Sequence, residues 1–289
     1  MSFALFTDAC SNLPGKLLAR YQIHVLPCSY TVDGVQTVYN GEIDAFDAHA
    51  HYELLRAGKH VQTSLLNTQL FLDSFRPALE AGQDILYVGM SSGISGTYQA
   101  STLAAGELRG EFPDRQIRTV DSLGAGFGPG LLTLRAAAAR EAGKDAGAAA
   151  DELEQARLNL CEYFTVDDLM FLRRSGRLNA ASAVVGTMLG IKPVLHMDDE
   201  GHLISMSKAR GRKASIEALA AKMGELGKDY DNSTVFICHG DCIDDARYLE
   251  KIVREKYGAK NVVIGYTGAV IGSHSGPGTL ALFFLGKNR

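Results

Sequence analysis

Serine, threonine and glycine residues that could hold an anion gather in residues 89–96, which read Gly-Met-Ser-Ser-Gly-Ile-Ser-Gly. An apolar run, residues 85–88, precedes them, and residues 97–108 are rich in Ala, Leu, Gln and Glu, which favour a helix. Glycines allow a sharp turn close to a ligand, hydroxyls donate and accept hydrogen bonds, and a helix start presents free N–H groups. A strand, a Ser/Gly turn and a helix in this order predict an anion site, with an ordinary capped turn as the alternative.

The same turn fits the serine-hydrolase pattern Gly-x-Ser-x-Gly, with Ser91 as the nucleophile. His274 lies downstream, and Asp198 or Asp241 would complete the order Ser, Asp, His. Two features oppose this reading. Glycines continue to Gly96, which places the helix start several residues after the serine, and no His-Gly-Gly stretch is present to build an oxyanion hole. A hydrolase using Ser91 and His274 is kept as the alternative function.

Further hydroxyls lie where strands are expected to end, which is where α/β sheets bind ligands. They are Thr63, Ser64, Ser92 and Ser95, and His274 is flanked by serines and glycines. Hydroxyls, turn N–H groups and one histidine suit a single carboxylate. A triphosphate would need a G-x-x-x-x-G-K-[ST] loop or clear metal ligands, and the sequence contains no such loop.

Patterns for other cofactors are incomplete. The glycines of residues 124–130 resemble a dinucleotide fingerprint, but its third glycine would fall at Pro129. Cys238, His239 and Cys242 supply fewer ligands than structural zinc requires. The alternating Asp, His and Glu of residues 47–53 face apart on a helix. We therefore predict no metal and no cofactor other than a bound ligand.

Composition narrows the class of protein. The 289 residues are 46% hydrophobic and 21% charged, as in a globular chain, and a net charge of −4 offers no basic face for nucleic acid. No run of 18 apolar residues occurs, and the first residues do not resemble a signal peptide. Five cysteines, an odd number, suit free thiols in a reducing compartment. These features predict a cytoplasmic protein without a transmembrane segment.

Strands alternate with helices up to about residue 145, which predicts an α/β fold whose N-terminal sheet is mostly parallel and flanked by helices. Residues 61–68 read as a polar loop, and residues 29–38 as a hairpin around Asp33-Gly34. The other expected elements are strands 3–7, 23–26, 85–88 and 117–120, and helices 15–21, 44–57, 69–81, 97–108 and one from residue 131.

The second half mixes antiparallel strands with helices, which predicts an α+β domain. A charged helix over residues 145–160 marks the change, so the expected domains are 1–157 and 158–289. The expected elements are strands 163–166, 234–239, 262–266 and 280–285, a hairpin of 191–197 with 202–208, and helices 180–189, 210–226 and 244–257.

Short motifs in order along nearly the whole chain together resemble the DegV family. They are Thr7-Asp8…Leu13-Pro14, Thr63-Ser64, Ser91-Ser-Gly-Ile-Ser-Gly-Thr97, Val120-Asp121-Ser122, Phe164-x-Val-Asp-Asp-Leu169, Gly176-Arg177-Leu178, Lys192-Pro193-Val-Leu, Arg210-x-x-Lys213-Ala and His274-x-Gly-Pro-Gly278. The family implies a two-domain α/β protein that binds a long-chain fatty acid in an apolar channel, here expected between the domains. Some members present the acyl carboxylate to a separate fatty acid kinase subunit.

The resemblance also implies the site residues. Thr63 and Ser95 correspond to the hydroxyls that contact the carboxylate; Arg177 and His274 correspond to family motif residues. The secondary candidates for the site are Ser64, Ser92, Gly96, Arg177 and His274. The chain departs from the family pattern after Thr63, where Leu-Leu replaces Gln-Pro, and at Ser175, which replaces a glycine. The expected protein is non-catalytic, with a fatty acid and a kinase subunit as partners and transient membrane contact left open.

Overall fold

The computed structural model describes residues 3–178 and 190–289, and the chain forms two compact units. Unit 1 comprises Met1–Ala45 and Gln62–Arg157, and unit 2 comprises Phe46–Val61 and Leu158–Arg289. The domains proposed from the sequence, 1–157 and 158–289, differ from these units by the segment Phe46–Val61. The proposed domains stay a prediction. The helix expected over 180–189 lies outside the described residues.

Unit 1 is built on a parallel four-stranded sheet in the order β2-β1-β6-β7. The strands are β1 (Ala4–Asp8), β2 (Ile23–Leu26), β6 (Ile85–Gly89) and β7 (Ile117–Asp121). Every residue of β1 and β6 is buried, which explains their continuous apolar sequences. Because Thr7 pairs with Val88, these two central strands end side by side.

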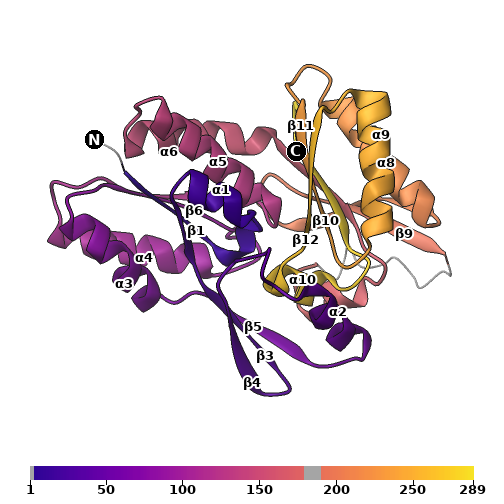
Figure 1. Ribbon diagram of the computed structural model, residues 1–289, viewed down its shortest axis with the longest axis horizontal. Helices are drawn as coiled ribbons and strands as arrows, with labels where there is room; N and C mark the ends of the chain where they lie inside the picture. Colours follow the sequence, from indigo (N-terminus) through magenta and orange to yellow (C-terminus); the bar gives the residue numbers. More distant parts are fainter. Residues whose placement is uncertain (1–2, 179–189) are drawn as a thin grey trace. The chain divides into compact units, whose positions relative to one another are not determined.

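Helices cover both faces of the parallel sheet (Figure 1). On one face, α3 (Thr68–Glu80) packs beside α4 (Thr97–Glu111), and on the other α5 (Phe127–Glu141) packs beside α6 (Ala146–Ala156). The short η1 (Ala9–Ser11) and α1 (Gly15–Arg20) lie between β1 and β2, and η2 (Arg157–Asn159) follows α6. The α/β class and the parallel N-terminal sheet predicted from the sequence are confirmed.

Aromatic rings form the core between α3 and this sheet. Phe75 of α3 lies edge-on to Phe6 of β1, with ring centroids 4.9 Å apart. Phe71, one turn earlier, lies edge-on to Tyr87 of β6 at 5.0 Å. All four side chains are buried, so they fix α3 against the two strands whose ends carry the candidate loops.

Three further strands form a small sheet in the order β4-β3-β5. The hairpin of β3 (Cys28–Val32) and β4 (Val35–Tyr39) turns at Asp33 and Gly34, both with positive φ, as the Asp-Gly pair predicts. The third strand, β5 (Val61–Ser64), corrects the prediction of a polar loop over 61–68. Pairing with a neighbouring strand supplies hydrogen bonds that the local sequence does not reveal.

Unit 2 contains a mixed six-stranded sheet in the order β10-β9-β8-β13-β11-β12. Only the pair β11–β12 is parallel among the described pairs, which confirms the mixed C-terminal sheet. The strands are β8 (Leu160–Thr165), β9 (Ile191–Met197), β10 (Leu203–Arg210), β11 (Thr234–His239), β12 (Asn261–Tyr266) and β13 (Leu280–Leu285).

Two long helices, α8 (Arg212–Leu226) and α9 (Ile243–Tyr257), pack together against the six-stranded sheet (Figure 1). Their buried residues, such as Leu219 and Leu249, share one apolar core with Leu282 of β13. Three short helices complete the unit: α2 (Ala48–Arg56), α7 (Met170–Arg174) and α10 (Ala269–Ser275). α10 packs against both α2 and α7.

Some boundaries differ from the predictions. α5 begins at Phe127 rather than near 131, so Gly130 lies inside the helix. A Cβ on Gly130 would lie 2.5 Å from the carbonyl oxygen of Ser11, so only glycine lets this helix approach the turn after β1. The helix expected over 145–160 ends at Ala156, and β8 begins at Leu160.

Among the described residues, no helix combines the length and hydrophobicity needed to cross a membrane.

Candidate functional site

The candidate site lies in unit 1, where the parallel sheet reverses its strand order. β1 connects through α1 to β2 on one side, and β6 connects through α4 to β7 on the other, so the two chain paths diverge from the adjacent strands β1 and β6. Ligands of open α/β sheets bind outside the carboxyl ends of the strands at such a point. Here these ends carry the turn after Asp8 and the Ser/Gly loop after Gly89.

Asp8 holds these two loops together. Its Oδ1 accepts a hydrogen bond from the Cys10 N–H at 2.8 Å and so caps η1. Its Oδ2 accepts from the Tyr87 hydroxyl at 2.8 Å and from the Met90 N–H at 3.2 Å. The carboxylate is buried, and its three donors satisfy it, so it fixes the first residue of the Ser/Gly loop.

A second carboxylate, Asp121 at the end of β7, fixes the next part of the loop. Its Oδ1 accepts from the N–H of Ser92 at 3.2 Å and from the N–H of Leu123 at 2.9 Å. Both aspartates thus accept backbone N–H groups, and Asp8 also accepts from the Tyr87 hydroxyl. Both residues belong to motifs shared with the family, but their supporting roles become visible only when the loops they join are brought together.

Ser91 is placed as a structural residue. Its side chain is fully buried, and its Oγ accepts from the Gly93 N–H at 3.0 Å. Its backbone closes the turn. The Ser91 carbonyl accepts a hydrogen bond from the Ser95 N–H, and the Ser91 N–H donates to the Gly124 carbonyl. α4 begins only at Thr97, so Ser91 does not stand on the strand-to-helix elbow that a hydrolase nucleophile needs. The serine-hydrolase alternative is not supported.

Ser95 lies half-buried at the entrance to α4. Its Oγ donates to the Thr97 hydroxyl at 3.1 Å and accepts from the Thr97 N–H at 3.3 Å. The N-cap of α4 is Gly96, which provides no side-chain cap. Helix N–H groups near Gly96 and the Ser95 hydroxyl therefore lie together at the positive end of the α4 dipole.

The segment containing Thr63 reaches the same corner through its neighbours. The Leu66 N–H donates to the Thr97 hydroxyl at 3.3 Å, and Leu65 Cδ2 lies 3.5 Å from where a Gly96 Cβ would be. Thr63 itself is half-buried on β5, whereas Ser64 is exposed, as alternate faces of a strand require. Thr97, which joins the two segments, is the residue that sequence reasoning did not single out.

Unit 2 brings the other two candidates together. Burial and the nearby positive charge of Arg177 lower the pKa of His274 to about 4, so its imidazole is neutral at pH 7. Burial also lowers the pKa of the Arg177 guanidinium, which donates to the carbonyl of Ser175. A neutral imidazole and a guanidinium provide directed hydrogen-bond donors for an anion.

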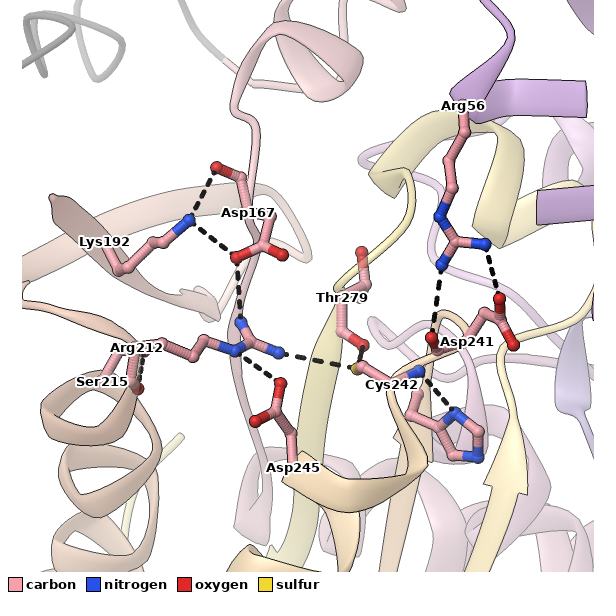
Figure 2. A network of polar contacts seen from close by, with 10 residues as sticks. Arg56, Asp167, Lys192, Arg212, Ser215, Asp241, Cys242, Asp245 and Thr279 are labelled. Carbon is pink, nitrogen blue, oxygen red and sulfur yellow. Dashed lines mark hydrogen bonds and ion pairs between the residues drawn. The ribbon is translucent and has the colours of Figure 1, made fainter. Parts of the chain in front are cut away.

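An ion-pair network supports the turn that follows His274 (Figure 2). Asp167, after β8, accepts from Lys192 Nζ at 2.6 Å, and its Oδ1 lies 3.7 Å from Arg212 Nη1. Arg212 also pairs with Asp245, at 2.8 Å. Gly278 packs so closely that a Cβ there would lie 2.1 Å from Asp167 Oδ2. Asp167 therefore positions the Gly-Pro-Gly turn, a role that the motif alone does not reveal.

The aspartates considered for a triad have other partners. Asp241 binds Arg56 Nη1 at 2.5 Å and His49 Nδ1 at 3.0 Å, and Figure 2 shows the Arg56 contact. Asp198 accepts from the backbone N–H groups of Glu200 and His202 and closes the β9–β10 hairpin. His49, Glu53 and Asp241 are close enough to share an ion, but the Arg56 guanidinium occupies that carboxylate.

Comparison with known sequences gives a match over the whole chain. A model of the DegV family matches residues 2–287. A DegV domain-containing protein of Clostridium perfringens is 38% identical over 287 residues, covering 99% of this chain and 98% of that protein. A DegV domain-containing protein of Streptococcus pyogenes is 35% identical over 292 residues, covering 100% of this chain and 99% of the relative.

Solved structures are similar over the same length. A Thermus thermophilus DegV family protein, described by its fatty acid binding, has a TM-score of 0.87 at 29% identity and covers 99% of this chain and 100% of its own. A fatty acid binding DegV family protein of Streptococcus agalactiae has a TM-score of 0.87 at 28% identity, with 100% coverage of both chains. DegV of Bacillus subtilis, a fatty acid binding protein, has a TM-score of 0.84 at 27% identity and covers 99% and 100%.

Proposed function

The chain belongs to the DegV family, and we propose that it binds one long-chain fatty acid and holds the carboxylate on Thr63 and Ser95. The solved relatives described as fatty acid binding proteins support the ligand class. Ser64, Ser92 and Gly96 are the secondary candidates in unit 1.

The observation that carries the proposal is the corner formed by Ser95, Thr97 and Leu66. It combines a half-buried hydroxyl, the N-terminus of α4 with Gly96 as its N-cap, and the segment after Thr63. A helix N-terminus and hydroxyl donors favour an anion, and a carboxylate accepts two or three such bonds. The buried Asp8 and Asp121 fix Met90 and Ser92, which precede Ser95 in the same loop.

The acyl tail supplies free energy but does not decide binding by itself. Burying about fifteen methylenes contributes roughly 12 kcal/mol, at about 0.8 kcal/mol each. The loss of translational and rotational freedom costs an estimated 4–15 kcal/mol, about as much as the tail gains. Hydrogen bonds to the charged head group add roughly 1.5–3 kcal/mol each, so the head-group corner determines whether affinity reaches the micromolar range.

We further propose that the protein presents its ligand and does not transform it. Ser91, the one serine in a nucleophile pattern, is buried and bonded within its own turn. A separate fatty acid kinase subunit would phosphorylate the presented carboxylate. Arg177 and His274 of unit 2 are proposed to meet the phosphate or the kinase. All five cysteines are free thiols, which supports placing the protein in the reducing cytoplasm.

The proposal is tested by extracting the ligand from protein purified without added lipid. Denaturing mass spectrometry should find a long-chain fatty acid. Delipidation should lower the melting temperature, and palmitate or oleate should restore it, because a ligand that binds only the folded state stabilises it. Butyrate, with the same carboxylate and almost no tail, is the matched control and should not restore it. A lipid-free preparation whose melting temperature ignores long-chain acids would exclude the fatty acid assignment.

A further inference from the structure

Two buried thiols of unit 1, Cys10 and Cys28, lie in contact. Their Sγ atoms are 3.8 Å apart, close enough for one thiol to donate a hydrogen bond to the other. Cys10 belongs to η1, directly after β1, and Cys28 begins β3. The pair thus joins the turn beside the parallel sheet to the small sheet β4-β3-β5.

Two of the other three cysteines have oxygen partners instead. Cys161 Sγ donates to the Asn288 carbonyl at 2.9 Å, and Cys242 Sγ donates to the Thr279 carbonyl at 3.3 Å, as Figure 2 shows for Cys242. Cys238 is buried, and burial raises the pKa of its thiol to about 12. Contact between two sulfur atoms therefore distinguishes Cys10 and Cys28.

We infer that Cys10 and Cys28 form a redox-active dithiol, which a small-molecule disulfide of the glutathione class oxidises to an intramolecular disulfide. A disulfide needs an S–S distance of about 2.05 Å, so the sulfurs must approach by about 1.8 Å. This inference is independent of the fatty acid proposal.

The exchange balances in two steps. The thiolate of one cysteine attacks the small disulfide, which forms a mixed disulfide and releases one small thiolate. The second cysteine, as its thiolate, attacks the protein sulfur of that mixed disulfide and displaces the second small thiolate. Two protein thiols lose two protons and two electrons, and one small disulfide becomes two small thiols.

The surroundings make this dithiol slow to react. The hydrogen bond with Cys28, burial and the neighbouring Asp8 carboxylate raise the pKa of Cys10 well above its ordinary value. A protonated thiol is a poor nucleophile, so exchange requires local opening of the turn or takes place before the chain has folded. The pair is therefore protected in the folded protein and oxidised over hours or during folding, rather than acting as a rapid sensor.

In the experiment, the reduced and denatured wild-type chain is refolded in glutathione buffers that contain an increasing fraction of oxidised glutathione. Refolding from the denatured state lets the thiols and the disulfide reach equilibrium before burial makes the thiols inaccessible. Remaining thiols are alkylated and the peptides mapped by mass spectrometry. We expect a Cys10–Cys28 link in the folded fraction, with Cys161, Cys238 and Cys242 alkylated. Prolonged incubation of the native protein with oxidised glutathione should give the same link more slowly.

A stability measurement supplies a second readout. The disulfide would restrict the unfolded chain between Cys10 and Cys28. The oxidised protein should therefore melt roughly 5 °C higher than the reduced form, and dithiothreitol should reverse the gain. Cys28→Ser removes one sulfur and should melt at the same temperature in both buffers, with Cys242→Ser as the control that keeps the gain. The inference would be overturned if folded protein from the most oxidising buffer still had all five thiols alkylated. It would also be overturned if disulfides formed among all the cysteines without preference for Cys10 and Cys28.

Discussion

Side chains at the carboxyl ends of β1, β6 and β7 serve two different purposes. Asp8 and Asp121 accept backbone N–H groups and hold the loops, so their negative charges are already satisfied. Ser95 and Thr97 present hydroxyls at the start of α4, with the helix dipole behind them. An anion is therefore favoured at the hydroxyls even though two carboxylates lie in the supporting turns.

The hydroxyls can be tested one at a time. Ser95→Ala and Thr63→Val should each weaken binding of palmitate at least about tenfold, because a hydrogen bond to a charged group contributes roughly 1.5–3 kcal/mol. Isothermal titration of delipidated protein measures the affinity. Thr102→Val is the matched control, since its hydroxyl donates only to backbone carbonyls within α4. Wild-type affinity in both test variants would remove these residues from the site.

Three histidines of unit 2 whose pKa the fold lowers predict a loss of stability in acid. Burial lowers the pKa of His51, His239 and His274 to about 4, with Arg177 adding to the effect at His274, while the unfolded value is about 6.5. Between pH 6.5 and 4 the unfolded chain binds protons that the folded chain does not. The free energy of unfolding should therefore fall as the pH falls through this window, and be unaffected by these groups above it.

Urea unfolding of delipidated protein at pH 7 and pH 5 measures this loss. Each histidine should contribute roughly 1–2 kcal/mol of it, allowing for partial exposure. His274→Gln should remove its own share of the pH dependence. An identical pH dependence in wild type and His274→Gln would show that the imidazole is not kept neutral by the fold.

At the scale of elements, the turn between α10 and β13 depends on close packing. The backbone N–H of Gly278 donates to the carbonyl of Gly240, and its φ is +75°. A Cβ on Gly278 would lie 2.1 Å from Asp167 Oδ2 and 2.9 Å from Asp167 Cβ, so rotating the aspartate cannot relieve the clash. The ion pairs of Asp167 with Lys192 and Arg212 resist its displacement.

Gly278→Ala should therefore lower the free energy of unfolding by roughly 2–5 kcal/mol, combining left-handed backbone strain with overpacking. Gly258→Ala is the control, because Gly258 has the same φ of +75° but no atom within 4 Å of the added Cβ. It should lose only about 1–2 kcal/mol. Equal losses in the two variants, measured by urea unfolding, would show that contact with Asp167 does not fix this turn.

For the whole molecule, we expect ligand presentation without chemistry. The purified chain with ATP and a fatty acid should form no acyl phosphate, because its sequence lacks a G-x-x-x-x-G-K-[ST] phosphate loop. Hydroxylamine trapping followed by mass spectrometry detects acyl phosphate as the hydroxamate. Adding a fatty acid kinase subunit is the positive control and should produce it. Acyl phosphate made by the purified chain alone would contradict a presenting role.

Much of the fold follows from local patterns in the sequence. The continuous apolar run of β6 predicted a buried parallel strand, and the Asp33-Gly34 pair predicted a hairpin. Both signals act over a few residues. The apolar run reflects burial on both faces of the strand, and the Asp-Gly pair reflects turn conformations that these two residues tolerate. The order of strand, Ser/Gly loop and helix from Ile85 to Glu111 was predictable for the same reason.

Features that depend on distant partners were not predictable. β5 has a mostly polar sequence and becomes a strand because it pairs at the edge of the small sheet. α10 contains glycine and serine, which are weak helix formers, but Gly272 allows the Tyr52 hydroxyl to approach within 2.4 Å of where a Cβ would be. Packing against α2 and α7 stabilises this helix, and no local pattern encodes that packing.

Residue types at short spacing were enough to predict the family, the alternation of elements and the hydroxyls proposed for the carboxylate. Which groups lie beside those hydroxyls depends on how the chain folds in three dimensions. Asp8 and Asp121 reach the Ser/Gly loop from strands on either side of β6, and Leu66 joins it at Thr97. Cys10 and Cys28 come into contact in the same way, from different elements. Such contacts depend on strand order and register, which many residues far apart in the chain set together.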